Sequence, residues 1–238
     1  MTDKATLYLT LRSAATFGRG DGVTGYIDRE VEHDKEGFPF LRGRTLKGLL
    51  REAAEEIAFA LEPEYDFLSD AERRARQWPW HAALNSLFGV GSSDLDGQGK
   101  LQVGDACLPW RLRALAMAGV THGQGQEAKK LSRQEMLALL TGIRRQTAVN
   151  VYGAPDHATL RSMRVILREV SFEAELSFAK ALEVDEWSLL VAATLNLRAA
   201  GTGRNRGRGW LIATLESEQR TQELFRQFQT ALAKKEAA

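Results

Sequence analysis

The stretch LLVAATLNLRAAGTGRNRGRGW (residues 189–210) decides the fold, because it joins an apolar helical segment to a loop of glycines and arginines. The strand-like segment WLIATLE (210–216) follows directly. Arginine supplies a fixed charge with bidentate donors, and glycine lets the backbone approach a ligand closely. A loop of this composition, placed between a helix and a strand, is typical of a site that binds phosphate.

The class of phosphate follows from what this loop lacks. It has no Gly-Lys-Ser/Thr, so it is not a Walker A loop, and the dinucleotide fingerprint opens a helix whereas this loop follows one. The pattern favours contact with an RNA backbone. The alternative is a solvated turn with surface arginines. The predicted contacts are Gly203, Arg204, Arg206 and Arg208.

Composition sets broad limits on the protein class. The chain has 238 residues, 44% of them hydrophobic and 26% charged, with a net charge of only +1. These values indicate a globular chain with a real core rather than a bulk polycation. Cys107 is the single cysteine, which excludes an intramolecular disulfide and fits a reducing, cytoplasmic compartment. No apolar run approaches the about 18 residues of a membrane span, so we expect no membrane contact.

Hydrophobic periodicity predicts an α+β fold. Alternating apolar residues indicate strands, and apolar residues at helical spacing indicate helices. Strands are predicted at 5–12, 100–108, 162–180 and 210–216, and the main helices at 43–61 and 183–201. This order approximates a modified ferredoxin-like (RRM-like) βαββαβ fold. We expect a single domain over 1–238, with large insertions at about 14–40, 62–99 and 119–160.

A second basic group lies at the predicted start of the helix 43–61. Lys47 and Arg51 are separated by four residues, which places them side by side on a helix, with Arg44 one turn earlier. Gly43 begins the helix, where free backbone N–H groups attract anions. The sequence predicts an RNA-phosphate contact here, with a plain solvated helix face as the alternative. The predicted contacts are Arg42, Arg44, Lys47 and Arg51.

Four stretches in order resemble the RAMP superfamily of CRISPR proteins, in particular the backbone subunits of type III effector complexes. They are GYIDREVEHDKEGFPFLRGRTLKGLLRE (25–52), LFGVGSSDLDGQGKLQVGDACL (87–108), TAVNVYGAPDHATLRSMRVILREVSFEAEL (147–176) and LLVAATLNLRAAGTGRNRGRGW (189–210). The resemblance implies guide RNA, target RNA, other CRISPR effector subunits and neighbouring RAMP subunits as partners. It also implies a thumb-like hairpin that interrupts the guide–target duplex. Tyr152 and Met163 flank this segment and would wedge between bases.

The long first loop supplies two candidates for catalysis. By resemblance, Asp28 occupies the position of the acidic residue with which type III backbone subunits cut target RNA, and it would hold Mg²⁺ if cleavage is active. RAMP nucleases that process CRISPR precursor transcripts often use a histidine near this loop as a general base, which would be His33. The simpler alternative is a loop that is charged only because it is solvated.

Three functions therefore compete. The first is a guide-binding backbone subunit that cleaves target RNA through Asp28. The second is a purely structural RNA-binding subunit, and the third is a stand-alone precursor-processing endoribonuclease that uses His33. Dependence on Mg²⁺ separates the first function from the third, and absence of cleavage indicates the second.

Overall fold

The computed structural model describes residues 4–22, 27–90, 97–119, 130–148, 152–154, 156, 159–216 and 218–236. Within this part, strands and helices are mixed along the chain and the sheets are antiparallel, which confirms the predicted α+β class. The predicted insertion at about 119–160 lies partly outside the described residues. None of the described helices combines the length and the apolar character that crossing a bilayer requires.

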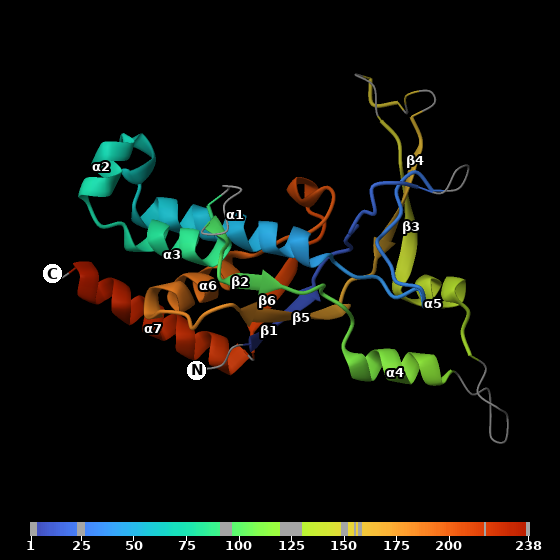
Figure 1. Cartoon of the computed structure of the whole chain (residues 1–238). Coiled ribbons are helices and arrows are strands. Elements are labelled where there is room, and N and C mark those ends of the chain that lie inside the picture. Colours follow the sequence, from blue (N-terminus) through green and yellow to red (C-terminus); the bar gives the residue numbers. More distant parts are fainter. Residues whose placement is uncertain are drawn as a thin grey trace.

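A four-stranded antiparallel sheet forms the centre of the molecule, in the order β2-β5-β1-β6 (Figure 1). Its strands are β2 (Leu101–Val103), β5 (Ser171–Phe178), β1 (Lys4–Leu11) and β6 (Leu211–Leu215). Strand β1 lies between β5 and β6, and Leu7 is opposite Ala174 on one side and Leu215 on the other. The alternation in β1 therefore buries Leu7, Leu9 and Leu11 on one face, as the sequence predicted.

Helices cover the apolar face of this sheet (Figure 1). The helical spacing of its leucines places Leu46 and Leu50 of α1 on the face that packs against the core. Helix α6 contributes Leu189 and Leu190 to the same core. The covering helices are α1 (Gly43–Leu61), α3 (Pro79–Phe88), α6 (Val184–Asn196) and α7 (Glu218–Glu236), with the short helix α2 (Asp70–Ala75) and the 3₁₀ turn Tyr65–Phe67 between α1 and α3.

A separate two-stranded hairpin projects from the end of the molecule opposite α7 (Figure 1). It pairs β3 (Thr141–Gln146) with β4 (Arg161–Ile166). Helix α5 (Arg133–Leu140) leads directly into β3 and begins at the predicted cap Ser132, which forms a capping box with Glu135. Helix α4 (Trp110–Ala118) precedes α5. The loop between β1 and α1 runs along β4.

Two strand predictions need correction. The segment 162–180 was expected to be one strand-like run, but a turn with Glu169 at φ 66° divides it into β4 and β5, which belong to different sheets. Leu167 lies at this turn and is 44% exposed. The strand predicted at 100–108 is regular only over Leu101–Val103. Gly104 and Cys107 still bond to β5, and Asp105 between them accepts from the Gly43 N–H at the start of α1.

Candidate nucleic-acid interface

The two basic segments face each other across a cleft. The start of α1 forms one wall, and the loop between α6 and β6 forms the other. The cleft has a volume of about 250 Å³, and Arg42 and Arg204 both line it. The structure therefore brings together two groups that the sequence nominated separately. The remaining lining residues are Phe17, Gly18, Glu32, Phe40, Leu41, Thr45, Leu49, Gly201 and Thr202.

Carboxylates of the same chain hold these two arginines. Both nitrogens of the Arg42 fork donate to Glu32 at 2.9 Å, which raises the pKa of the Arg42 guanidinium. Arg204 donates to the two oxygens of Glu52 at 2.7 and 2.9 Å. Arg42, Arg204 and Glu52 are exposed, and exposed ion pairs contribute about 0–1 kcal/mol. Glu32 is buried, however, so a phosphate can compete for Arg204 at small cost, whereas its capture of Arg42 would leave a buried carboxylate without a partner.

The predicted contacts on α1 differ in their availability. Arg44 is exposed, and within the described residues it has no hydrogen-bonding partner. Arg51 pairs with Glu55 at 2.7 Å. Lys47 is half-buried and donates to the Leu101 carbonyl at 2.7 Å, and burial, followed by the charge of Arg51, lowers the pKa of its ammonium group. Lys47 is therefore less available to a phosphate than Arg44, and its contact with RNA stays a prediction.

Gly43 was predicted to expose the first N–H groups of α1 to an anion, but in the structure it allows close packing within the protein. A Cβ here would lie 2.2 Å from the Val103 carbonyl oxygen, so glycine allows the start of α1 to pack against the end of β2. The Gly43 N–H donates to Asp105 at 2.7 Å. The first backbone N–H of the helix is thus hydrogen-bonded to a carboxylate of the same chain, so it is not open to bind a phosphate.

The loop of glycines and arginines at residues 201–209, called the Gly/Arg loop below, is ordered by contacts within the protein. Residues Arg204–Arg206 form a 3₁₀ turn between Gly203 and Gly207, which both have left-handed backbone conformations. Gly209 has φ 65°, and a Cβ there would lie 1.9 Å from the Ala200 carbonyl oxygen. This glycine closes the loop on itself, so the loop presents its arginines from a fixed backbone.

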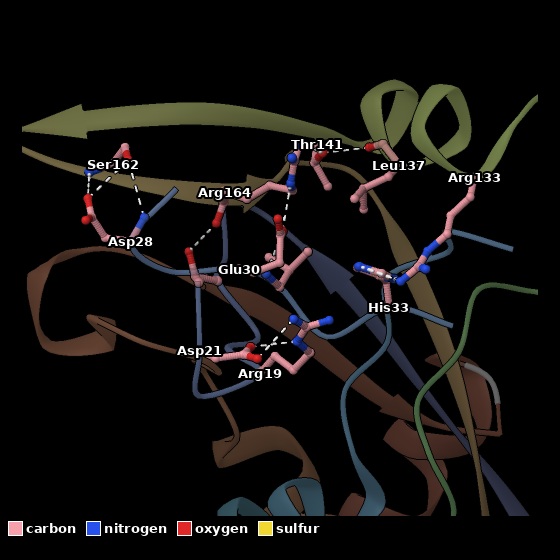
Figure 2. A network of polar contacts seen from close by, with 12 residues as sticks. Arg19, Asp21, Asp28, Glu30, His33, Arg133, Leu137, Thr141, Ser162 and Arg164 are labelled. Carbon is pink, nitrogen blue, oxygen red and sulfur yellow. Dashed lines mark hydrogen bonds and ion pairs between the residues drawn. The ribbon is translucent and has the colours of Figure 1, made fainter. Parts of the chain in front are cut away.

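Asp28 lies beside β4 at Ser162, away from the end of the hairpin that carries Thr141 (Figure 2). Its Oδ2 atom accepts from the Ser162 backbone N–H at 2.6 Å and from the Ser162 hydroxyl at 3.1 Å. The Asp28 N–H donates in turn to the Ser162 carbonyl at 3.0 Å. These bonds lower the pKa of the Asp28 carboxyl, the backbone bond most and the hydroxyl bond next. The side chain is exposed and ionised at neutral pH.

A buried ion pair fixes the same loop two residues later. Glu30 is buried and accepts from Arg164 Nε at 2.7 Å, while Arg164 Nη1 lies 3.2 Å from the Thr141 hydroxyl (Figure 2). Arg164 lies on β4 and Thr141 on β3, so both strands of the hairpin are tied to the loop that carries Asp28. The position of Asp28 is thereby coupled to the hairpin.

The sequence profile of the RAMP superfamily matches residues 8–212 of this chain. This match covers both walls of the cleft, the Asp28 loop and the hairpin. The chain belongs to the RAMP superfamily. No curated protein matches the chain in sequence.

Solved structures extend this result at the level of the RAMP fold. A chain from "Cryo-EM structure of the Type III-B Cmr-beta bound to cognate target RNA" has a TM-score of 0.58 and 11% identity, over 94% of this chain and 99% of that one. A chain from "Type III-B Cmr-beta Cryo-EM structure of the Apo state" also has a TM-score of 0.58 and 11% identity, over 90% and 98%. At this identity the likeness shows a shared fold.

Asp28 was also predicted to hold Mg²⁺ in this RAMP chain. Among the described residues, no group of three or more His, Cys, Asp or Glu side chains is placed to bind a metal ion. Asp28 contributes one carboxylate, whose Oδ2 is already engaged by Ser162. Mg²⁺ in nucleic-acid enzymes is often held by one or two carboxylates together with substrate phosphates and water. The donor set at Asp28 therefore fits Mg²⁺ only if RNA supplies the remaining ligands.

His33 is held apart from Asp28. Its Nδ1 atom lies 3.1 Å from the Asp34 carbonyl oxygen, and Nη2 of Arg133 lies 3.3 and 3.4 Å from the two ring nitrogens. Figure 2 shows His33 and Asp28 on opposite sides of Glu30. A histidine general base needs a ring nitrogen open to the substrate, and here the guanidinium of Arg133 covers the ring edge.

Sequence reasoning missed the partners that hold these residues. Ser162 and Glu52 carry no local signal, because their partners Asp28 and Arg204 lie far away along the chain. Glu32 lies only ten residues from Arg42, but no helix or strand joins the two. Met163, predicted to flank the thumb and wedge between bases, is buried, whereas Tyr152 is 91% exposed. The wedge prediction is therefore wrong for Met163 in this conformation, and it stays a prediction for Tyr152.

Proposed function

We propose that this chain is a CRISPR-RNA-binding backbone subunit of a type III effector complex. It acts in the cytoplasm, holds guide RNA by its phosphates and shape, and leaves the reading of target RNA to base pairing. The observation that carries the proposal is the convergence of two basic segments, at Arg42 and Arg204, on one cleft of a RAMP protein. The shared fold with chains of Cmr-beta, one of them bound to cognate target RNA, supports it.

We also propose the finer architecture that the function needs. The strand order β2-β5-β1-β6, with α1 and α6 as the helices after the first and third of these strands in sequence, supports a ferredoxin-like unit. The hairpin β3-β4, which projects beyond this unit, acts as the thumb, and neighbouring RAMP subunits pack along the guide.

RNA binding in the cleft proceeds by exchange of anions. A guide phosphate takes the place of Glu52 at Arg204, because a guanidinium fork fits a phosphate as well as a carboxylate. Arg42 stays paired with the buried Glu32 and adds its charge to the cleft. Arg44 adds a cation that has no carboxylate to release among the described residues. Displaced counterions add to the driving force and make affinity depend on salt.

For cleavage, we propose that Asp28 positions the 2′-hydroxyl of target RNA for attack on the adjacent phosphate. The hydrogen bonds from Ser162 keep the Asp28 carboxylate ionised and fix its orientation. Bound Mg²⁺ would neutralise charge between this carboxylate and the phosphate. A structural subunit without cleavage is the second candidate, and the engagement of Oδ2 by Ser162 favours it.

Guide binding is tested by replacing Arg204, Arg206 and Arg208 together with alanine. We expect weaker binding for every guide sequence, because phosphate contacts carry affinity without sequence information. The slope of log affinity against log salt should fall by about 0.7 for each lost contact to single-stranded RNA.

The matched control is the triple variant Arg74, Arg76 and Arg220 to alanine, which removes the same charge from α2, from the residue that follows it and from α7. Circular dichroism verifies folding of both variants. Equal binding by wild type and the loop variant at several salt concentrations would show that this loop does not grip RNA.

A further inference from the structure

Arg208 is a buried cation without a carboxylate. Its side chain lies against the hairpin, and the residue is only 8% exposed. Its Nη1 atom contacts the Met163 sulfur, and a thioether is a weak acceptor that carries no charge. Arg164, the buried arginine on the same strand as Met163, is instead neutralised by Glu30 at 2.7 Å. No described carboxylate lies within ion-pair distance of Arg208, so its charge is uncompensated.

Arg144 joins Arg208 from a distant part of the chain. Arg144 lies directly opposite Met163 in the register of β3 and β4, and directly opposed residues of an antiparallel pair project from the same face. Arg144 therefore projects from the hairpin face that Arg208 contacts. Arg206 precedes Arg208 by two residues in the Gly/Arg loop. Burial, then the charges of Arg144 and Arg206, lower the pKa of Arg208, as expected for neighbouring cations.

Three like charges that meet without an acid repel one another, and an anion placed between them relieves that repulsion. Within the described part of the chain, neither Arg144 nor Arg206 has a carboxylate partner. Arg42, Arg51 and Arg204 are each already paired with a glutamate. Arg144, Arg206 and Arg208 thus bring three arginines without a described carboxylate partner to the place where the hairpin meets the loop.

We propose that Arg144, Arg206 and Arg208 form a binding site for one phosphate of RNA, and that this phosphate clamps the base of the hairpin to the Gly/Arg loop. Guanidinium forks match the tetrahedral oxygens of a phosphate in pairs. The identity of the ligand as RNA rests on the proposed function, whereas the phosphate site itself does not.

The site would also set where RNA passes Asp28. Met163, which contacts Arg208, is the next residue along β4 after Ser162, which holds Asp28. Adjacent residues of a strand project to opposite faces and are separated by about 3.8 Å between Cα atoms. A phosphate clamped on the Met163 side would therefore hold RNA on the face of β4 opposite the Ser162 side chain, one residue along the strand from the position that binds Asp28.

The test compares Arg144→Gln with Arg145→Gln. Both variants remove one charge from β3, but Arg145 is opposite Ser162 and projects from the other face. With a fluorescein-labelled single-stranded RNA of mixed sequence, we expect Arg144→Gln to lose about tenfold in affinity, as for one charge-assisted contact. Its salt slope should fall by about 0.7, whereas Arg145→Gln should change affinity by less than about twofold.

A second arm uses inorganic phosphate against sodium chloride at equal ionic strength, read by thermal unfolding. Phosphate should raise the Tm of wild type and of Arg145→Gln but not of Arg144→Gln. If wild type fails to bind RNA while this phosphate effect is seen, the proposed function fails and the phosphate site stands. Equal losses of RNA affinity in both variants, or a phosphate effect that is absent in wild type or unchanged in Arg144→Gln, would overturn the site.

Discussion

Arg204 and Glu52 form a bidentate ion pair across the rim of the cleft, with nitrogen–oxygen distances of 2.7 and 2.9 Å. Glu52 belongs to α1 and Arg204 to the Gly/Arg loop, so the pair joins the two walls. In the free protein, the Arg204 guanidinium that is predicted to bind phosphate is thus already paired with the Glu52 carboxylate. This relation makes RNA binding a competition, and it predicts a variant that binds more tightly.

Glu52→Gln should increase affinity for RNA by about two- to fivefold, because it releases the Arg204 guanidinium and removes a negative charge from the cleft. The free energy of unfolding should change by less than about 1 kcal/mol, as is usual for an exposed pair. Fluorescence anisotropy with labelled RNA measures the affinity, and urea unfolding measures the stability.

The control for this variant is Glu175→Gln, which removes one charge from the exposed pair with Lys4. If both variants tighten binding to the same degree, the gain reflects net charge alone. A loss of affinity in Glu52→Gln would show that Glu52 orders Arg204 for RNA rather than competing with it.

Asp28→Asn should abolish cleavage of complementary target RNA, by at least about a hundredfold, while guide and target binding stay intact. The amide keeps the size of the side chain but loses the charge. Cleavage by wild type should require Mg²⁺ or Mn²⁺ and stop with a chelator. The measurement uses labelled target RNA and the reconstituted effector complex, at equal target occupancy for both proteins.

Ser162→Ala is the companion variant for Asp28. It removes the hydroxyl bond of 3.1 Å but keeps the backbone N–H bond of 2.6 Å, so we expect a partial loss of cleavage. Equal rates of target cleavage by wild type and Asp28→Asn would show that Asp28 takes no part in the reaction. No cleavage by either protein favours the structural subunit, and metal-independent cutting of the repeat favours His33.

The half-buried Lys47 predicts a dependence of stability on pH. Because burial lowers the pKa of Lys47 below its ordinary 10.5, the unfolded chain binds this proton more tightly than the folded chain does. The resulting penalty is fully present below the lowered pKa and disappears as the pH rises towards 10.5. Wild type should therefore gain stability relative to Lys47→Met over this range, as measured by urea unfolding at each pH.

A constant difference between wild type and Lys47→Met across that range would contradict the burial of the charge. The same geometry determines what we expect for Lys47→Glu. This variant places a carboxylate beside the Leu101 carbonyl oxygen that the lysine now contacts. It should lose stability as well as RNA affinity, rather than RNA affinity alone.

Gly207 and Gly209 form a matched pair for testing the rigidity of the loop. Both have left-handed backbones, at φ 71° and 65°, which cost alanine about 1–2 kcal/mol. A Cβ at Gly207 meets nothing within 4 Å, whereas at Gly209 it would lie 1.9 Å from the Ala200 carbonyl oxygen. Gly209→Ala should therefore destabilise by about 2 kcal/mol more than Gly207→Ala in urea unfolding. Similar losses in the two variants would indicate a loop that adjusts freely.

Local pattern alone determined several parts of this protein. The helix predicted at 43–61 matches α1 in both bounds, because its leucines and alanines repeat at helical spacing and face the sheet. The alternation at 5–12 located β1, and the placement of the Gly/Arg loop between a helix and a strand was also predicted correctly. These features depend on residues close together in the chain, where periodicity and backbone preference act directly.

Only the tertiary structure decided which residues meet. The run 162–180 has one continuous strand-like pattern, and packing against two different sheets divides it into β4 and β5. Burial of Lys47, capture of Arg204 by Glu52, and the attachment of Asp28 to Ser162 all join residues distant in sequence. Charged and hydroxyl side chains pair with almost any polar neighbour, so sequence does not specify their partners. The fold chooses them by bringing separate segments into contact.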